Sequence, residues 1–421
     1  MKKSDVVVIG GGLSGLFAAA LAAQNGKKVT VLSYGAGALT IGGGVIDIMG
    51  YADGNVPFRA PLEGVENAPK GHPYTLIGAQ AVTEAMATFC KMATAEGYAY
   101  QGSLGKMQWI PTAVGTLKPT AFVPRTMDVS KMESAKKLVV VDLEGLKDFS
   151  APMAAKNLAL LFPNKTVETV KVPELEKSGR DMTAFDTARC LDRAEVRTMF
   201  AAALKSKAGQ GVCFIVPPIL GTHASYVALD DITKQVGAPL VECAAVAPSV
   251  TGIRLRELML SVLRKQGVVF IEKAHVCGSI VENGKVVAVT TKDFGRQRTY
   301  RADEFILASG GFYGAGLVAD QENVKEVVFD LPIVAPARVE DWTNTKMFSN
   351  EKQPFAMIGI AVNEQLQPVD AEGDVIYPNV RVIGRSLAGY DFCFEKSGNG
   401  VALTSAYKAV SLIVKGGISH E

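Results

Sequence analysis

The 421-residue sequence predicts an α/β protein: a Rossmann-like domain with a second α/β domain inserted into it. Val6 to Gly35 reads as a strand, a Gly-rich turn, a small-residue helix and a second strand. From about residue 136, strands and helices of similar length alternate, which is typical of a second, largely parallel sheet. We therefore expect 1–109 and 251–421 to form the first domain, and 110–250 the inserted one.

The first turn carries a dinucleotide-binding pattern, Gly10-x-Gly12-x-x-Gly15, between a strand and a helix. Glycines at this spacing let the backbone turn tightly, approach a phosphate closely and pack the helix on the strand. The start of the helix, with Leu13 and Ser14, offers unpaired N–H groups to an anion. This context predicts a nucleotide or flavin site.

The second strand ends at Ser33, where an Asp or Glu normally binds the ribose of an adenosine. An NADP site would need a nearby Arg, and "SYGAGALTIGGG" has none. FAD could still bind, with Ser33 making one neutral hydrogen bond to the ribose. FMN has no adenosine, so it needs no such contact. The missing acid therefore favours FMN, with FAD as the alternative.

The following segments complete the first domain and lead into the inserted one. A Gly-rich loop, "IGGGVIDIMG", contains the predicted cofactor residues Gly43 and Gly44. A connector and a helix over 79–97 follow it. In the inserted domain we expect four strands, "KKLVVVDL", "VETVKV", "GVCFIVP" and "PLVECAAV". Helices over 145–161, 183–208 and 228–236 separate these strands.

After the insertion the sequence returns to the first domain. A helix over 254–266 precedes a β-meander that starts at Val268, with a hairpin at Asn283-Gly284. A buried strand, "EFILASGG", then ends in Gly310 and Gly311.

Two late segments have the form of cofactor-binding turns. Gly384 follows a strand, and Asn399, Gly400 and Val401 lie at a helix start. Together with the N-terminal pattern and Gly310–Gly311, they resemble the three cofactor segments of the two-dinucleotide-binding-domain flavoproteins. In that class the last helix points its N-terminus at the flavin, where its dipole favours the negative charge of the reduced ring.

A closer resemblance covers nearly the whole chain. The motifs that carry it are "HPY", "GTLKPT", "FDTARCLD", "PSVTGIRL" and "GYDF". They are similar to those of the B-subunit family of anaerobic glycerol-3-phosphate dehydrogenases. The resemblance implies a flavoprotein, described with FMN, that works with a larger FAD-containing subunit. An iron–sulfur subunit would attach the pair to the inner face of the cytoplasmic membrane, and the complex would oxidise sn-glycerol 3-phosphate to dihydroxyacetone phosphate.

Candidate catalytic residues are few. Arg254 and Arg189 lie in family-like stretches, and a forked guanidinium suits a phosphate or carboxylate, although a salt bridge is the alternative. Lys118 is a weaker case of the same kind. His223 follows a strand end, where loops carry function, whereas His72 reads as a turn residue. No Ser–His–Asp spacing, HExxH or P-loop pattern is present, which argues against a hydrolase, zinc protease or kinase.

Composition narrows the function classes further. The formal charge is only +2 and no basic block exceeds two residues, which argues against a nucleic-acid partner. The longest uncharged apolar stretch, Val6 to Ala23, is interrupted by glycines, so we expect a cytoplasmic protein. The 6 cysteines form no C-x-x-C, so no metal site is expected. Two alternatives remain open: another flavin-dependent reductase, or a flavin-binding partner that relays electrons without a substrate site.

Overall fold

The computed structural model describes residues 3–176, 179–244, 247–293, 296–347 and 349–416. Its backbone contacts divide the chain into two compact units. The first comprises Met1–Ala38, Ile46–Phe89 and Met259–Glu421, and the second comprises Leu39–Val45 and Cys90–Leu258. Each unit is described by itself, and the domain boundaries expected near 110 and 250 stay a prediction.

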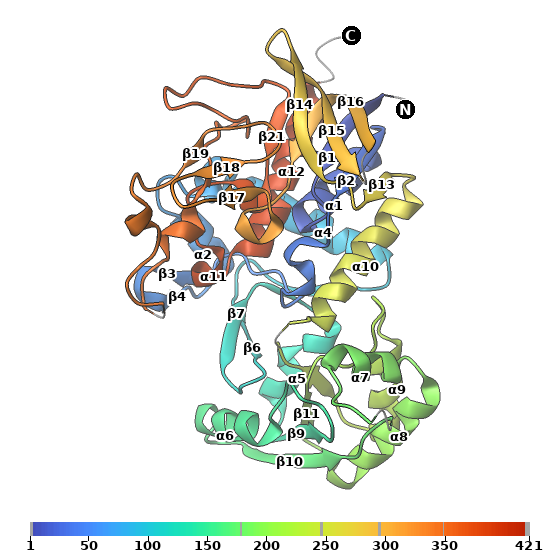
Figure 1. The fold of residues 1–421 in the computed structure, drawn as a ribbon. Coiled ribbons are helices and arrows are strands. Elements are labelled where there is room, and N and C mark those ends of the chain that lie inside the picture. The colour runs from blue at the N-terminus through green and yellow to red at the C-terminus, as the bar shows by residue number, and fades with distance from the viewer. Residues whose placement is uncertain (1–2, 177–178, 245–246, 294–295, 348, 417–421) are drawn as a thin grey trace. The chain divides into compact units, whose positions relative to one another are not determined.

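The first unit is built on a seven-stranded sheet in the order β13-β2-β1-β16-β15-β14, with β21 also beside β16 (Figure 1). The parallel part contains β1 (Ser4–Ile9), β2 (Val29–Ser33), β13 (Val269–Glu272), β16 (Arg296–Leu307) and β21 (Val380–Val382). Parallel strands end at the same edge of a sheet. The predicted turns after β1, β2, β16 and β21 therefore lie at one edge, where α/β sheets bind ligands.

The antiparallel part of this sheet confirms the hairpin but corrects its extent. β14 (Val276–Glu282) and β15 (Lys285–Asp293) are joined at Asn283 and Gly284, with φ of +52° and +74°. The expected meander also included the strand that starts near Val268, and this was wrong. That strand is β13, which pairs in parallel with β2, because neither its composition nor its length distinguishes a parallel from an antiparallel partner.

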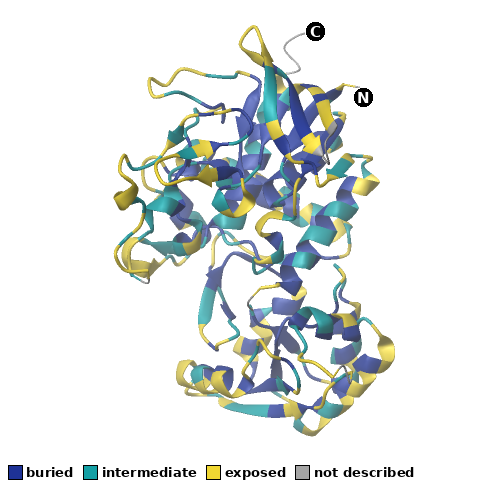
Figure 2. Ribbon diagram, in the orientation of Figure 1, coloured by how far each residue is buried: buried dark blue, intermediate teal, exposed yellow. Residues whose placement is uncertain are grey.

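Helices cover this sheet and bury mainly small side chains. α1 (Leu13–Gln24) is almost wholly buried, and α12 (Gly398–Gly416) packs against it (Figure 2). Alanines and glycines on both helices allow this close approach. The other α-helices wholly within this unit are α2 (Pro61–Glu66), α3 (Pro73–Ile77) and α11 (Phe392–Glu395), and α4 (Ala79–Ala95) lies partly in it. α4 and α10 (Val250–Lys265) each run from one unit into the other.

The first unit also contains several short strands and 3-10 turns. Its additional strand pairs are β3 (Tyr51–Ala52) with β4 (Val56–Pro57), β17 (Leu317–Ala319) with β18 (Val324–Glu326), and β19 (Ile333–Val334) with β20 (Gly359–Ile360). Single 3-10 turns cover Gly37–Thr40 at the edge of the second unit, and Phe312–Gly314, Val339–Trp342 and Gly384–Ser386 in the first.

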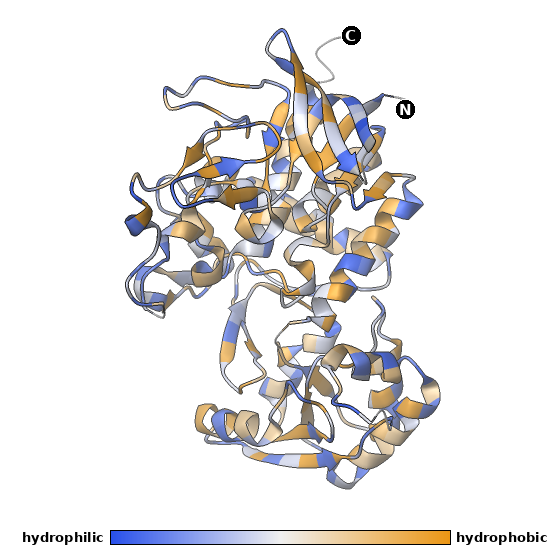
Figure 3. Ribbon diagram, in the orientation of Figure 1, coloured by the Kyte–Doolittle hydropathy of each residue, from blue (hydrophilic) through white to orange (hydrophobic). Residues whose placement is uncertain are grey.

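The second unit is a parallel α/β sheet in the order β10-β9-β11-β12. These strands are β9 (Lys137–Leu143), β10 (Thr166–Val172), β11 (Val212–Val216) and β12 (Leu240–Glu242). Hydrophobic side chains along β9 and β11 pack with α5 (Val129–Ser134) and α6 (Ala151–Leu161) into one core (Figure 3). Two antiparallel pairs join β5 (Tyr100–Gly102) with β8 (Phe122–Pro124), and β6 (Gln108–Pro111) with β7 (Leu117–Thr120). The β6–β7 hairpin lies between β5 and β8 in the chain.

Two of the helices expected in this unit have different limits. The helix expected from Gly145 begins six residues later, at Ala151, with Pro152 in its first turn, where proline is well tolerated. The helix expected over 183–208 is two helices, α7 (Ala184–Leu191) and α8 (Ala194–Leu204). They separate at Asp192, whose carboxylate accepts hydrogen bonds from the backbone and hydroxyl of Thr222. α9 (Val227–Val236) agrees with the expectation.

Within the part of the chain that the structure describes, none of the helices is both long enough and apolar enough to cross a bilayer.

Candidate functional site

The turn after β1 has the geometry of an anion cradle. Gly10 has a φ of +124°, and a Cβ there would lie 2.1 Å from the carbonyl oxygen of Ala308. A Cβ on Gly15 would lie 2.1 Å from the carbonyl oxygen of Gly10. Gly12 is different, because a Cβ there would meet no atom within 4 Å. Gly12 is also the N-cap of α1 and supplies no side chain to its N–H groups, so the helix start fits a phosphate.

Ser33 faces inward. Its side chain is only 2% exposed, and its hydroxyl donates to the carbonyl oxygen of Gly35 at 2.8 Å. A Cβ on Gly11 would lie 2.0 Å from the Ser33 oxygen, so the two residues are closely packed. The Ser33 hydroxyl is therefore engaged inside the protein rather than presented outward to a ribose.

The later predicted segments converge on the same turn. Gly384 has a φ of +65°, and a Cβ there would lie 2.5 Å from the hydroxyl oxygen of Ser14 in α1. Gly310 has a φ of +82°, and its N–H donates to the Ser386 hydroxyl at 3.1 Å. The neighbouring Gly311 lies against the side chain of Arg385. The structure thus brings together the ends of β1, β16 and β21.

The start of α12 packs against the second half of the Gly-rich loop and against Tyr74. The N–H of Gly400 donates to the carbonyl oxygen of Asp47 at 2.8 Å, and a Cβ there would lie 2.4 Å from the Tyr74 oxygen. Tyr74 in turn donates to the carbonyl oxygen of Ile48 at 2.7 Å. Asn399 is half-buried beside it, and Val401 is fully buried. Only glycine fits at 400 without displacing one of these groups.

Gly43 and Gly44 are held by residues of the second unit. The hydroxyl of Thr251 donates to the carbonyl oxygen of Gly43 at 2.7 Å, and the hydroxyl of Tyr100 donates to that of Gly44 at 2.6 Å. Gly44 has a φ of +67°, and a Cβ there would lie 2.4 Å from the backbone of Thr251. These two glycines are described with the second unit, so their cofactor role stays a prediction.

A buried polar network, not foreseen in the sequence, lies before α12. His72 accepts a hydrogen bond from the Tyr74 N–H at Nδ1, which leaves the proton on Nε2 to be donated to Glu395 at 3.0 Å. Lys352 lies 2.9 Å from the other Glu395 oxygen and 3.0 Å from Asp53. Burial alone would raise the pKa of Glu395, but His72 and Lys352 lower it below its usual value. His72 is 323 residues from Glu395, so no local pattern connects them.

Arg254 is fully buried and paired, which agrees with the salt bridge that was the alternative to anion binding. Its two terminal nitrogens donate to the carboxylate of Glu242 at 2.6 and 3.0 Å, and Nε donates to the carbonyl oxygen of Gly221 at 2.8 Å. Burial would lower the pKa of Arg254, but the Glu242 carboxylate raises it above its usual value. A guanidinium engaged in this way is not available to a substrate anion.

The other catalytic candidates lie on the surface of the second unit. Arg189 is exposed and lies 3.6 Å from Asp186, three residues earlier on α7. His223 is also exposed; its Nδ1 lies 2.9 Å from Glu257, which raises the pKa of the imidazole. Lys118 lies on β7. Among the described residues, Arg189 and His223 have different carboxylate partners, Asp186 and Glu257.

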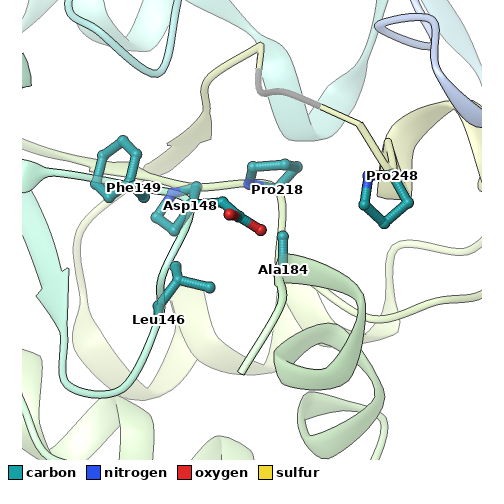
Figure 4. A pocket seen from close by; sticks show the side chains of 7 residues that line it. Leu146, Asp148, Phe149, Ala184, Pro218 and Pro248 are labelled. Atoms are coloured by element: carbon teal, nitrogen blue, oxygen red, sulfur yellow. The ribbon is translucent and has the colours of Figure 1, made fainter. Parts of the chain in front are cut away.

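A small pocket of the second unit contains none of the candidate residues (Figure 4). It is mainly apolar, with one carboxylate, and is lined by Leu146, Asp148, Phe149, Ala184, Pro217, Pro218 and Pro248.

Comparison with known proteins agrees with the geometry of the first unit. Residues 5–401 match the family model described as FAD binding domain. The B-subunit of a probable anaerobic glycerol-3-phosphate dehydrogenase from Halobacterium salinarum is 30% identical, and the alignment covers 97% of each chain. The corresponding subunit of Vibrio vulnificus strain YJ016 is 29% identical over 97% of this chain and 96% of its own. A solved 3-ketosteroid delta1-dehydrogenase from Sterolibacterium denitrificans aligns over 99% of this chain and 100% of its own, with 12% identity and a TM-score of 0.48.

The family match favours FAD rather than FMN, which corrects the expectation drawn from Ser33. That expectation assumed that the residue at the end of β2 points outward. Ser33 is instead buried against Gly11, and its hydroxyl proton is donated to Gly35.

Proposed function

Since the chain belongs to the B-subunit family of anaerobic glycerol-3-phosphate dehydrogenases, a family of FAD-binding oxidoreductases, we propose that it is the FAD-holding subunit of an enzyme that oxidises sn-glycerol 3-phosphate to dihydroxyacetone phosphate. The observation that supports this most directly is the open cradle at Gly12. At this cradle the start of α1 has no side-chain cap. It lies at the edge of the sheet where β16 and β21 also end.

The residues of this site have separable roles. The N–H groups at the start of α1 hold the FAD diphosphate, because the helix dipole and the unpaired donors both favour an anion. The start of α12, at Asn399 and Gly400, would place the positive end of the helix dipole where it stabilises negative charge on a bound flavin. Bound flavin supplies the acceptor for the two electrons removed from the substrate carbinol.

In this proposal the electrons leave through two partner proteins. One is a larger subunit, which also contains FAD, and the other is an iron–sulfur subunit. The iron–sulfur partner holds the chain at the inner face of the cytoplasmic membrane. The word subunit in the names of the relatives supports an assembly, and the identity of its members belongs to the proposal.

A second candidate function is an electron relay without a substrate site of its own. The pairing of Arg254 with Glu242 favours it, since this pairing removes the strongest anion-binding candidate that the sequence suggests. In this version the same cradle holds FAD, and glycerol 3-phosphate binds to the larger partner.

Two measurements test these proposals. Acid release of the cofactor from the purified protein, followed by mass spectrometry, is expected to yield FAD; FMN alone would contradict the cofactor assignment. Oxidation of glycerol 3-phosphate is then assayed with an artificial acceptor, first with the chain alone and then with the larger partner. Turnover by the chain alone supports a substrate site in it, and turnover only in the pair supports the relay. No turnover in either would contradict both.

A further inference from the structure

Arg385 is a half-buried cation without a carboxylate partner among the described residues. It follows Gly384 directly, and its guanidinium donates to the backbone carbonyls of Ala356 and Ile358. Its central carbon lies 5.5 Å from the centre of the Tyr390 ring and 5.4 Å from that of Phe392. Both distances lie within the range of cation–π attraction.

The surroundings of Arg385 are the predicted flavin segments. A Cβ on Gly311, at the end of β16, would lie 3.3 Å from the Arg385 Cγ and 3.5 Å from its Cζ. Gly384 lies against Ser14 in the first turn of α1. The Phe392 ring would meet a Cβ on Gly398, the first residue of α12, at 3.2 Å. The Arg385 side chain therefore lies directly against Gly311, and its neighbours Gly384 and Phe392 contact the starts of α1 and α12.

The three buried arginines among the described residues each lie near a carboxylate, which Arg385 does not. Arg254 is paired with Glu242, Arg197 with Asp231 at 2.6 Å, and Arg381 lies 3.8 Å from Glu304. A cation that has lost part of its water needs compensation, and carbonyls and ring faces supply only a part of it. A guanidinium has five N–H donors, so Arg385 retains donors for an anion after bonding two carbonyls. Their forked geometry suits the oxygens of a phosphate.

We propose that Arg385 binds a phosphoryl group in the flavin site. The proposal rests on the proposed function, which supplies two sources of that chemistry: the diphosphate of FAD and the phosphate of glycerol 3-phosphate. Gly384 contacts α1, so the neighbouring Arg385 lies near the proposed site of the FAD diphosphate. Arg385 also lies over the Phe392 ring, which packs against the start of α12.

The test uses Arg385→Gln, which removes the charge, and Arg385→Lys, which keeps the charge but not the fork. FAD affinity is measured by titrating FAD into the apoprotein. The phosphate site is probed separately, as the rise in melting temperature that inorganic phosphate or glycerol 3-phosphate causes in the FAD-loaded chain. Arg338→Gln is the matched control, because Arg338 is exposed and lies near Glu340 and Asp341.

Loss of a charge-assisted contact weakens binding about tenfold to a hundredfold. Weaker FAD binding in Arg385→Gln, with a smaller loss in Arg385→Lys, assigns the contact to the FAD diphosphate. Normal FAD affinity with loss of the phosphate-induced rise assigns it to the substrate. If both variants bind FAD as well as wild type and show the same response to phosphate, including no response in any of the three, the proposal is overturned. A wild-type chain that binds no FAD would contradict the proposed function instead.

Discussion

Arg254 and Glu242 are both 0% exposed and neutralise each other inside the second unit. Taking two charges out of water is costly, and their mutual hydrogen bonds offset that cost only while both are present. Arg189 forms a pair of the opposite kind, since its side chain is 67% exposed and its partner is 3.6 Å away. Water screens such a surface pair, so it contributes little to stability.

At the residue scale we therefore expect Arg254→Ala to lower the free energy of unfolding by about 3–5 kcal/mol, because Glu242 is left buried and unpaired. Arg189→Ala is the matched control and is expected to cost less than about 1 kcal/mol. Urea unfolding measures both. The double variant Arg254→Met, Glu242→Leu should be more stable than Arg254→Ala, since neither charge remains. A fully stable Arg254→Ala that binds phosphate less well would restore the anion-binding hypothesis.

At the scale of elements, the turn between β1 and α1 uses its glycines for different reasons. Gly10 and Gly15 are required by packing, since a Cβ on either would overlap a backbone carbonyl. Gly12 has a φ of −80° and open space beside it, so the fold alone would accept a side chain there. A side chain at 12 would occupy the approach to the start of α1.

This difference predicts that Gly12→Ala separates cofactor binding from folding. We expect its FAD affinity to fall about tenfold or more, because the methyl group blocks close approach of the phosphate. Stability without cofactor should change by less than about 1 kcal/mol. Gly15→Ala should instead destabilise the apoprotein, by about 1–3 kcal/mol, because the backbone must shift. Thermal unfolding and FAD titration of both variants check this, and unchanged FAD affinity in Gly12→Ala would place the diphosphate elsewhere.

At the scale of the whole molecule, the first unit is assembled from three separate stretches of chain. Its central sheet aligns β1 with β16 and β21, which are roughly 300 residues or more later in the sequence. A ligand bound at the ends of these strands contacts all of them together, so its binding energy is added to the stability of the folded unit.

FAD is accordingly expected to raise the melting temperature of the apoprotein. At a free concentration 100 times its dissociation constant, the stabilisation is about 2.7 kcal/mol. Hydrogen exchange should slow at the turns after β1, β16 and β21 in the same experiment. FMN is the control, and it should stabilise the protein less because it lacks the adenosine half. Equal or greater stabilisation by FMN would contradict the assignment of FAD.

Features that depend only on neighbouring residues could be predicted from the sequence. The β1–α1–β2 unit, the spacing of Gly10, Gly12 and Gly15, and the Asn283-Gly284 hairpin are local, since backbone sterics and periodicity act within a few residues. The alternation of strands and helices also indicated the second parallel sheet, and the motifs spread along the chain identified the family.

Contacts between groups that are distant in the sequence could not be predicted and became visible in the folded chain. Folding paired β13 with β2, turned Ser33 inward, joined Arg254 to Glu242 and His72 to Glu395, and left Arg385 among aromatic rings beside the predicted flavin segments. The physical reason is that a charge or hydroxyl acts through whatever folding brings within a few ångströms of it. Partners far apart along the chain leave no periodic signal in the sequence. The sequence therefore shows the type of each residue but did not predict which residue it contacts.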